Sequence, residues 1–444
     1  MKKVWRTGIF MLTILSLLSS CAEQNEKLEP LQAGTIKVVY LDEESFYEDY
    51  GKYFKLQFPQ IDVEVISKSK LITEFNNVND YEEATRKFLN TYNPDVLLLD
   101  EQMFKAFVEE GKLYNLETAI HQDNFDLNGF MPGLIDKLKA LGKGDLYGLV
   151  PSVTLHALYY NEDLFKEYQL EPPRNKMSWQ ELLELADRFM GQGSGGRHVY
   201  GLEETYSDPG REVLNIGFDS GLQLFDEKAD HVLINTDGWK SVMKLVTDGV
   251  RSGSVILNSN GSNKHFMNKE AAMIFGSPDL MLSLKQNGIQ MNWGIATMPV
   301  HSNDESVNIS SREIFAISAA SSNKRAAWEL VKFVNGADMA KSNSKTYNGT
   351  LPSRTGFLKE YDGKSLEAFY MLKVRETAKK WGNAHVPEPF FRMFVEPMRA
   401  EMQAVIENRK TVDEAAAVLE EKGQAVLMQA RSETGKRGIV DRKR

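Results

Sequence analysis

Apolar and polar positions in the first third of the chain follow two alternating patterns. Short apolar or strictly alternating runs predict strands. These runs are TIKVVYL (35–41), IDVEVIS (61–67) and PDVLLLD (94–100). Apolar residues spaced by three and four predict amphipathic helices at 44–59, 80–91 and 101–111. Because strands and helices alternate, the pattern favours an α/β architecture with a mainly parallel sheet.

The same alternation resumes after residue 145, and helices dominate the C-terminal part. LYGLVP and LHALYYN predict strands within 146–161, and MSWQELLELADRFMG predicts a helix at 177–191. Ser178 and Glu181 have the spacing of a capping box at the start of this helix. From about residue 320 the pattern predicts mainly helices, among them 324–334, 366–381 and 411–428.

The first twenty residues follow a different pattern. Lys2, Lys3 and Arg6 precede an apolar run at 9–18, and small serines follow it. The run is shorter than the roughly 20 residues that a bilayer span needs. A charged, then apolar, then small segment is typical of a secretory signal peptide, which we assign to 1–20.

Cys21 is the only cysteine among the 444 residues. Together with the preceding LSS it resembles a bacterial lipobox, in which a peptidase cuts before the cysteine and a lipid is attached to its sulfur. The alternative is an ordinary signal peptide cut near Ser20, which leaves a free thiol. A lone exported thiol has no partner within the chain, which favours the lipid anchor. Residues 21–34 are then a lipidated cysteine and a polar, flexible spacer.

Charge and composition narrow the range of partners. Loss of the leader removes three positive charges and takes the formal net charge from -9 to -12. This acidity argues against nucleic acid, whose binding requires basic patches, and against electrostatic adhesion to anionic lipid. With 42% hydrophobic residues and no disulfide within the chain, two lobes stabilised by burial are expected.

Common motifs of catalysis are missing from the sequence. No two of the seven histidines are three or four residues apart, and no G-x-S-x-G occurs. The glycines of GQGSGG (191–196) follow a predicted helix, which favours a surface loop over a dinucleotide-binding loop. We therefore expect no enzymatic activity, no cofactor and no metal ion. The acidic pair Glu203 and Glu204 leaves a glycosidase open, since sequence does not show whether two carboxylates face each other.

One segment keeps a calcium site open. Asn124, Asp126 and Asn128, followed by Gly129, match the first half of a calcium-binding loop. Ile135 occupies the position at which such a loop requires a bidentate glutamate. A helix-capping loop is therefore the favoured interpretation.

Several segments, in order, resemble the extracellular solute-binding lipoproteins of ABC importers, a family that includes sugar-binding proteins. They lie at 93–120, 146–173, 268–281, 314–334, 349–354 and 411–421. Tyr160-Asn161 and Ala271-Ala272-Met273 are the more specific of these matches. The resemblance covers nearly the whole chain after the leader. It implies a two-lobed periplasmic-binding-protein-like fold of type II, with hinged lobes and a mainly helical C-terminal part.

By the same resemblance, the chain divides into two interleaved lobes. Lobe one is 35–151 plus 277–318, lobe two is 152–276 plus 319–430, and a basic tail at 431–444 is expected to fray. The chain is expected to cross between the lobes near 151–154, 273–278 and 317–320. Crossings of this kind let two lobes hinge over a ligand.

Candidate binding residues follow from the strand ends and from the resemblance. In open α/β sheets ligands bind beyond the carboxyl ends of the strands. The candidate ligand-binding set is Asp42, Glu43, Asp100, Glu101, Thr154, Glu203, Tyr206, Asp279, Trp381, Phe390 and Phe391. For the acids the alternative role is helix capping, and for the aromatic residues it is packing.

The resemblance implies a receptor that captures a small solute, in the first place a sugar or oligosaccharide, for the transmembrane subunits of an ABC permease. Carboxylates suit such a ligand because they accept strongly from hydroxyls. A monomer is expected, exported and lipid-anchored to the outer face of the bacterial cytoplasmic membrane. Three alternatives stay open: a cationic or peptide-like solute, a secreted hydrolase such as a glycosidase, and a ligand sensor without transport.

Overall fold

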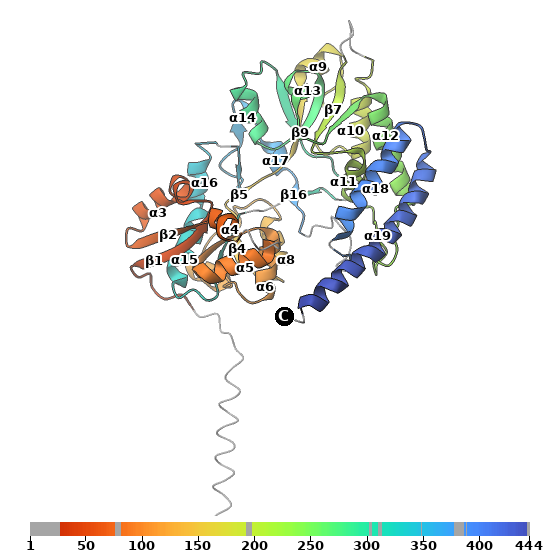
Figure 1. Cartoon of the computed structure of the whole chain (residues 1–444). Helices are drawn as coiled ribbons and strands as arrows, with labels where there is room; N and C mark the ends of the chain where they lie inside the picture. The colour runs from red at the N-terminus through yellow and green to blue at the C-terminus, as the bar shows by residue number, and fades with distance from the viewer. Residues whose placement is uncertain are drawn as a thin grey trace, which may run out of the picture. The chain divides into compact units, whose positions relative to one another are not determined.

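The chain folds into two compact units (Figure 1). The computed structural model describes residues 27–75, 81–191, 198–301, 304–309, 313–347, 349–376, 386–387 and 389–441, with side chains described up to Glu433. Unit 1 comprises Met1–Asn128, Leu141–Leu149 and Arg312–Gly336. Unit 2 comprises Gly129–Ala140, Val150–Ser311 and Ala337–Arg444. Each unit has its own sheet.

Unit 1 contains a mixed sheet of five strands in the order β2-β1-β3-β12-β4. The strands are β1 (Gly34–Tyr40), β2 (Ile61–Ser67), β3 (Val96–Leu99), β4 (Gly148–Leu149) and β12 (Ile314–Ile317). The helices are α2 (Glu43–Phe46), the π-helical turn η1 (Tyr47–Gly51), α3 (Lys52–Gln57), α4 (Ser69–Glu74), α5 (Tyr81–Tyr92), α6 (Glu101–Glu109), α7 (Glu117–Asp123) and α15 (Lys324–Val334).

Strand directions in unit 1 bring several strand ends to one edge. β1 is parallel to β2 and to β3, with Val38 opposite Val96. β12 is antiparallel to β3, with Ile314 opposite Leu99. All four residues of β3 are buried, and α15 packs on β1 and β12 while α6 packs on β3. The predicted α/β organisation of this part of the chain is confirmed.

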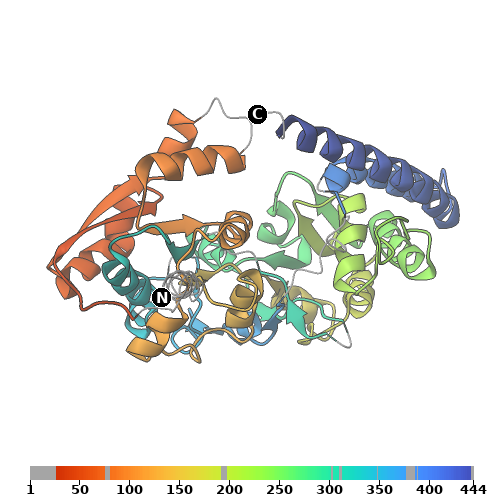
Figure 2. The same cartoon turned by 90° about the horizontal axis from the view of Figure 1, so that it is seen from below.

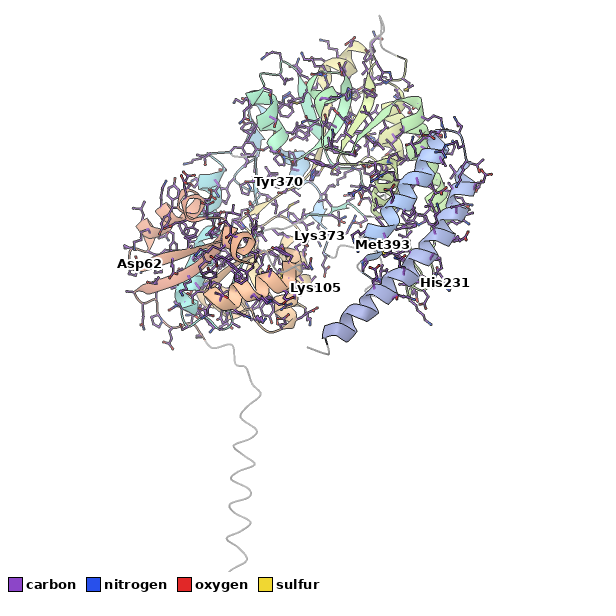
Figure 3. The ribbon with its side chains drawn as sticks, viewed as in Figure 1. Asp62, Lys105, His231, Tyr370, Lys373 and Met393 are labelled. Carbon is purple, nitrogen blue, oxygen red and sulfur yellow. The ribbon has the colours of Figure 1, made fainter. Side chains whose placement is uncertain are left out.

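β2 is the edge strand of this sheet, and charge protects it. Burial alternates over Ile61–Val65, as the sequence pattern predicts, and Ile66 is buried as well. The exposed Asp62 (Figure 3) forms an ion pair with Lys55 of α3 at 2.6 Å. Charged side chains on an edge strand discourage pairing with another chain.

Unit 2 contains a second five-stranded sheet, in the order β10-β6-β9-β7-β8. Its strands are β6 (Ala157–Asn161), β7 (Tyr200–Thr205), β8 (Val255–Asn258), β9 (Ala271–Gly276) and β10 (Trp293–Ala296). Short strands outside it are β5 (Ser152–Val153), β11 (Ser306–Val307), β13 (Leu351–Pro352), β14 (Glu360–Tyr361), β15 (Lys364–Ser365) and β16 (Lys373–Val374). β7 is parallel to β8 and β9, whereas β6 is antiparallel to both of its neighbours, β9 and β10.

Helices supply most of the remaining mass of unit 2. They are α8 (Leu134–Leu141), α9 (Glu162–Glu167), α10 (Trp179–Asp187), α11 (Pro209–Asp219), α12 (Asp237–Ser252), α13 (Lys264–Met267), α14 (Asp279–Gln286), α16 (Ala337–Asn343), α17 (Glu367–Tyr370), α18 (Pro389–Ile406) and α19 (Val412–Asp441). α18 and α19 pack side by side (Figure 2). Within the described residues, no helix is both long enough and apolar enough to cross a membrane.

The helix predicted at 177–191 is confirmed as α10, and its start has the predicted capping box. The backbone N–H of Glu181 donates to Ser178 Oγ at 3.2 Å, and the backbone N–H of Ser178 donates to Glu181 Oε2 at 2.8 Å. Local chemistry therefore determines this helix start.

The helix predicted at 366–381 is wrong for 371–376. Among the described residues of this stretch only Glu367–Tyr370 is helical, and Lys373–Val374 forms β16, which pairs with β11. Residues 377–381 lie outside the described part of the chain. The backbone N–H of Val374 also donates to the carbonyl oxygen of Pro132 at 2.8 Å. These tertiary hydrogen bonds override the helical pattern. At the C-terminus a helix is longer than predicted. α19 continues to Asp441, into the tail that was expected to fray.

The observed units divide the chain differently from the expected lobes. Residues 277–311 belong to unit 2, because β10 pairs with β6 in its sheet. Residues 319–336 belong to unit 1, because α15 packs on β1 and β12. Cys21 and the leader lie outside the described residues, as does most of GQGSGG.

Candidate functional site

Four strand ends meet at one edge of the sheet in unit 1. β1, β2 and β3 end there at Tyr40, Ser67 and Leu99, and β12 begins there after Glu313. Side chains that follow or precede these ends are therefore neighbours. This is the edge at which open α/β sheets bind ligands.

Asp42 and Asp100 lie at this edge as predicted, and both cap helices. Asp42 Oδ1 accepts from the backbone N–H of Ser45, and Asp100 Oδ1 accepts from that of Met103, both at 2.8 Å. The Ser45 N–H lowers the pKa of Asp42, which favours its carboxylate form. Asp42 Oδ2 accepts from Ser45 Oγ at 2.8 Å, whereas Asp100 also hydrogen-bonds Tyr81.

Glu43 and Glu101 are the first residues of α2 and α6. Glu43 is exposed and Glu101 is half-buried. Carboxylates are stabilised at helix N-termini without any ligand. The four predicted acids of unit 1 therefore share one sheet edge, and capping, the alternative weighed for them, is the observed role of Asp42 and Asp100.

Lys68 is the cation of this edge and was not among the predicted residues. It follows β2 directly, its backbone N–H donates to the carbonyl oxygen of Tyr40 at 2.8 Å, and its side chain is half-buried. Burial lowers the pKa of its ammonium, while the carboxylates of Asp100 and Glu313 act in the opposite direction. Among the described residues, no carboxylate forms a salt bridge with this ammonium. Lys68 therefore has donor capacity left for a ligand.

Tyrosines and further acids complete the polar cluster. The Tyr40 hydroxyl donates to Asp49 Oδ2 at 2.7 Å, and the ring of Tyr50 meets that of Tyr40 edge-on at 6.0 Å. Burial raises the pKa of Glu313, which Lys68 opposes and Asp49 reinforces. Burial also raises the pKa of both tyrosines, so they stay neutral hydroxyls. The edge thus offers both acceptors and donors.

Lys68 and Glu313 were absent from the candidate ligand-binding set, and they differ in whether the sequence could have indicated them. Lys68 stands at the end of the predicted strand 61–67, so the rule that selected Asp42 and Asp100 selects it as well. Glu313 is different, because nothing in the local pattern shows that β12 inserts antiparallel beside β3.

The corresponding edge of unit 2 carries Thr154, Tyr206 and Asp279. β7, β8 and β9 end at this edge, and β6 begins there. Thr154 precedes β6, Tyr206 follows β7, and Asp279 opens α14 after β9. All three are exposed, so the fold leaves these predicted residues of unit 2 available to a ligand.

Tyr206 presents an exposed aromatic ring. It has a left-handed backbone with φ of 57°, and its side chain is 74% exposed. Its ring lies against Gly261, where an added Cβ would stand 2.2 Å from the ring atom Cζ. The exposed part of an aromatic ring can contact the C–H groups of a ligand.

Glu203 lies inside unit 2, which corrects its expected place in the ligand-binding set. It is fully buried and accepts from the backbone N–H of Phe266 and from Asn258 Nδ2, both at 2.7 Å. Successive residues of a strand face opposite sides of a sheet. Glu203 therefore faces α13, and Glu204 faces the other side, where it meets Glu212. The pair does not form the two facing carboxylates of a glycosidase.

Phe390 and Phe391 pack within unit 2 instead of facing a ligand. Phe390 is fully buried, with its ring 4.9 Å from that of Phe225 and 5.1 Å from that of Phe394. Phe391 is half-buried, with its ring 6.1 Å from that of Phe225. Packing, the alternative weighed for both, is their observed role. Trp381 lies outside the described residues.

The segment from Asn124 to Gly129, which matches half of a calcium-binding loop, forms a capping loop. Asn124 ends α7 with φ of 49°, and the backbone N–H of Asn128 donates to Asp126 Oδ1 at 2.8 Å. In the described part of the chain, no group of three or more His, Cys, Asp or Glu side chains is arranged to hold a metal ion.

The amino-acid sequence is similar to those of known proteins. A family model described as bacterial extracellular solute-binding protein matches residues 70–369. A binding protein of Brucella abortus (strain 2308) is 23% identical over 357 residues, which covers 74% of this chain and 77% of its own. The sn-glycerol-3-phosphate-binding periplasmic protein UgpB of Salmonella typhi is 27% identical over 187 residues, 40% of this chain and 41% of its own.

Solved structures show the same fold. The sugar-binding protein MalE from Xanthomonas citri is similar with a TM-score of 0.67 and 19% identity, covering 90% of this chain and 99% of its own. A sugar transporter from Rhizobium etli in an open conformation has a TM-score of 0.66 and 20% identity, covering 88% and 99%. At these identities the likeness concerns the fold. The predicted periplasmic-binding-protein fold of type II is confirmed.

Proposed function

The chain belongs to the bacterial extracellular solute-binding proteins, and we propose that it captures a sugar or oligosaccharide outside the cytosol for an ABC importer. In this role it acts as a monomer, performs no chemistry and passes its solute to the transmembrane permease subunits. The names of the similar solved proteins, a sugar-binding MalE and a sugar transporter, support this ligand class.

The polar edge of unit 1 carries the proposal. Asp100 and Glu313 can accept from hydroxyls, while Lys68 can donate to them. A sugar hydroxyl does both, so a polyhydroxylated solute satisfies the whole set. Aromatic surface for sugar C–H groups is available on Tyr206 in unit 2.

Charge at the same edge disfavours an anionic solute. Asp42, Asp49 and Asp100 outnumber the ammonium of Lys68, so an anion such as sn-glycerol-3-phosphate, the ligand named for UgpB, meets more repulsion than attraction. The same excess of carboxylates would attract a polyamine. A neutral sugar is preferred over a cation because of the names of the similar solved proteins.

A thermal-shift screen tests the ligand class. Trisaccharides such as maltotriose and xylotriose are compared with sn-glycerol-3-phosphate, spermidine and a tripeptide. A bound solute at 100 times its Kd adds about 2.7 kcal/mol of stability, so one sugar should raise the Tm while the other classes do not. Stabilisation by sn-glycerol-3-phosphate or spermidine alone would overturn the sugar assignment. The solute should also be recovered unchanged, and steady turnover that survives repurification would contradict a receptor.

Substitutions at the unit 1 edge test the site. Asp100→Asn and Lys68→Met should each lower the affinity for the identified sugar by roughly ten- to a hundredfold, since a charge-assisted hydrogen bond contributes about 1.5–3 kcal/mol. Lys52→Met, on the exposed surface of α3, is the control and should bind as wild type. Calorimetric titration measures affinity, and melting curves show whether each variant is folded. Unchanged affinity in both edge variants would mean that the solute binds elsewhere.

The membrane attachment proposed at Cys21 has its own test. Cys21→Ala should stop incorporation of labelled fatty acid and release the protein or leave its precursor uncut. Ser20→Ala keeps a small residue before the cut and should retain the lipid. A Cys21→Ala protein that still carries lipid would rule out the anchor on the outer face of the cytoplasmic membrane.

A further inference from the structure

Residues 27–33, here called the strap, precede β1 and are fixed to unit 1 at one point. Most strap residues are exposed, but Leu28 is only 8% exposed. The side-chain amide of Gln122 in α7 engages both peptide groups of Leu28. Its Oε1 accepts from the Leu28 N–H, and its Nε2 donates to the Leu28 carbonyl oxygen, both at 2.9 Å. The predicted flexible spacer is thus held on unit 1 from Leu28 onward.

The strap lies at the edge of the sheet opposite Asp42 and Asp100. It leads into Gly34, the first residue of β1, whose backbone N–H donates to the carbonyl oxygen of Gln60 at 3.1 Å. Together with the loop at Asp145 and the start of α15, the strap lines a cavity of about 910 Å³. Because strap residues face this cavity instead of a packed interior, the hold on the strap depends chiefly on the Leu28–Gln122 clasp.

We propose that this clasp makes the amino edge of unit 1 the membrane-facing surface of the protein, with the lipid bilayer as its partner. The inference rests on the proposed anchor at Cys21. Seven peptide steps separate Cys21 from Leu28 and span at most about 25 Å, whereas thirteen steps to Gly34 would span about 45 Å. The short tether keeps the amino edge near the lipid. The carboxyl edge, with its polar cluster, lies at the far end of the same strands.

Hydrogen exchange tests the clasp without any lipid. In the soluble chain from residue 22 to 444, the Leu28 amide should be protected. Gln122→Ala should speed its exchange by about tenfold or more. His121→Ala, at the preceding position of α7 and with a side chain 83% exposed, should leave the rate unchanged. Equal exchange at Leu28 in wild type and Gln122→Ala would overturn the clasp.

A defined anchor tests the membrane-facing surface. The chain from residue 21 has one thiol, so Cys21 can be coupled to maleimide lipid in phosphatidylcholine vesicles. A donor dye is attached through an azide-bearing residue at position 145, on the amino edge, or 44, in α2, both exposed in the native chain. Energy transfer to headgroup acceptors should be stronger from 145 than from 44, and Gln122→Ala should narrow the difference.

Equal transfer from the two positions in the wild-type chain would overturn the proposal. Because the vesicle anchor is chemical, this result is independent of whether cells attach a lipid. Loss of native lipidation in the Cys21 experiment would refute the anchor, and equal transfer here would refute the orientation.

Discussion

Glu204 and Glu212 place two carboxyl groups inside unit 2, close to Tyr206. Glu204 lies near the end of β7 and Glu212 in α11, and both are buried. Burial raises the pKa of both groups, that of Glu212 to about 7. The Ser207 hydroxyl donates to Glu212 Oε2 at 2.6 Å and opposes this rise, whereas Asp219 adds to it. Glu212 is therefore a group of unit 2 whose charge changes near neutral pH.

The sign of the pH effect follows from the raised pKa. A carboxyl with a higher pKa in the folded state stabilises the fold while it is protonated. Its contribution is complete below about pH 4.5 and is lost as pH rises through about 7. Glu212→Gln should therefore flatten the fall in Tm between about pH 5 and 8. Melting curves at several pH values check this, with the exposed Glu421→Gln as control. An unchanged slope in Glu212→Gln would contradict it.

Single residues also show what sequence could predict of the site. Asp42 and Asp100 were placed correctly at the sheet edge because a strand end is visible in the apolar pattern. Glu203 was not, because the face of a strand that meets a helix depends on how the sheet is covered, and α13 covers that face. Phe390 and Phe391 were misjudged for the same reason. Their packing partner Phe225 lies far away in sequence.

Two helices of unit 1 are joined by one carboxylate. Asp123, the last residue of α7, accepts from Arg325 Nη1 at 2.9 Å, Lys332 Nζ at 2.5 Å and Trp328 Nε1 at 3.0 Å, all in α15. Burial opposes the charged form, but the donors from Arg325, Lys332 and Trp328 outweigh it and lower the pKa of Asp123 to about 2. The contact between these helices is therefore electrostatic as well as apolar.

This contact should weaken in acid. A lowered pKa stabilises the fold above the unfolded value of about 3.9, and the contribution is lost as pH falls through about 2. Asp123→Asn should cost about 2 kcal/mol in the free energy of unfolding at pH 7. The difference from wild type should shrink between pH 4 and 2. Urea unfolding at these pH values measures it, and the exposed Asp62→Asn should change little. A cost that is the same at pH 7 and pH 2 would exclude this origin.

Elements were predictable where local chemistry decides them. Ser178 and Glu181 mark the start of α10 with hydrogen bonds between residues three apart. The helical pattern at 366–381 failed because Val374 finds its partners in Pro132 and β11. A local pattern contains no trace of such distant hydrogen bonds.

At the level of the whole molecule, the resemblance predicted two lobes, and the observed units differ from these lobes chiefly in the segments 129–140, 277–311 and 319–336. Val96 pairs with Ile317, and Leu158 pairs with Ala296. Such pairings assign 277–311 to unit 2 and the helix α15 to unit 1. Periodicity describes which face of a segment is apolar, and it does not say which distant segment will cover it.

The position of β12 determines when unit 1 can fold during synthesis of the chain. β12 lies between β3 and β4, so the apolar β3 has β1 as its only neighbour until Ile314–Ile317 has been synthesised. Pairing over so long a separation is slow, because the loop must close before the contacts form. Unit 1 therefore stays incomplete while most of the chain is made. The leader expected at 1–20 is therefore synthesised long before the first sheet of the chain can be completed.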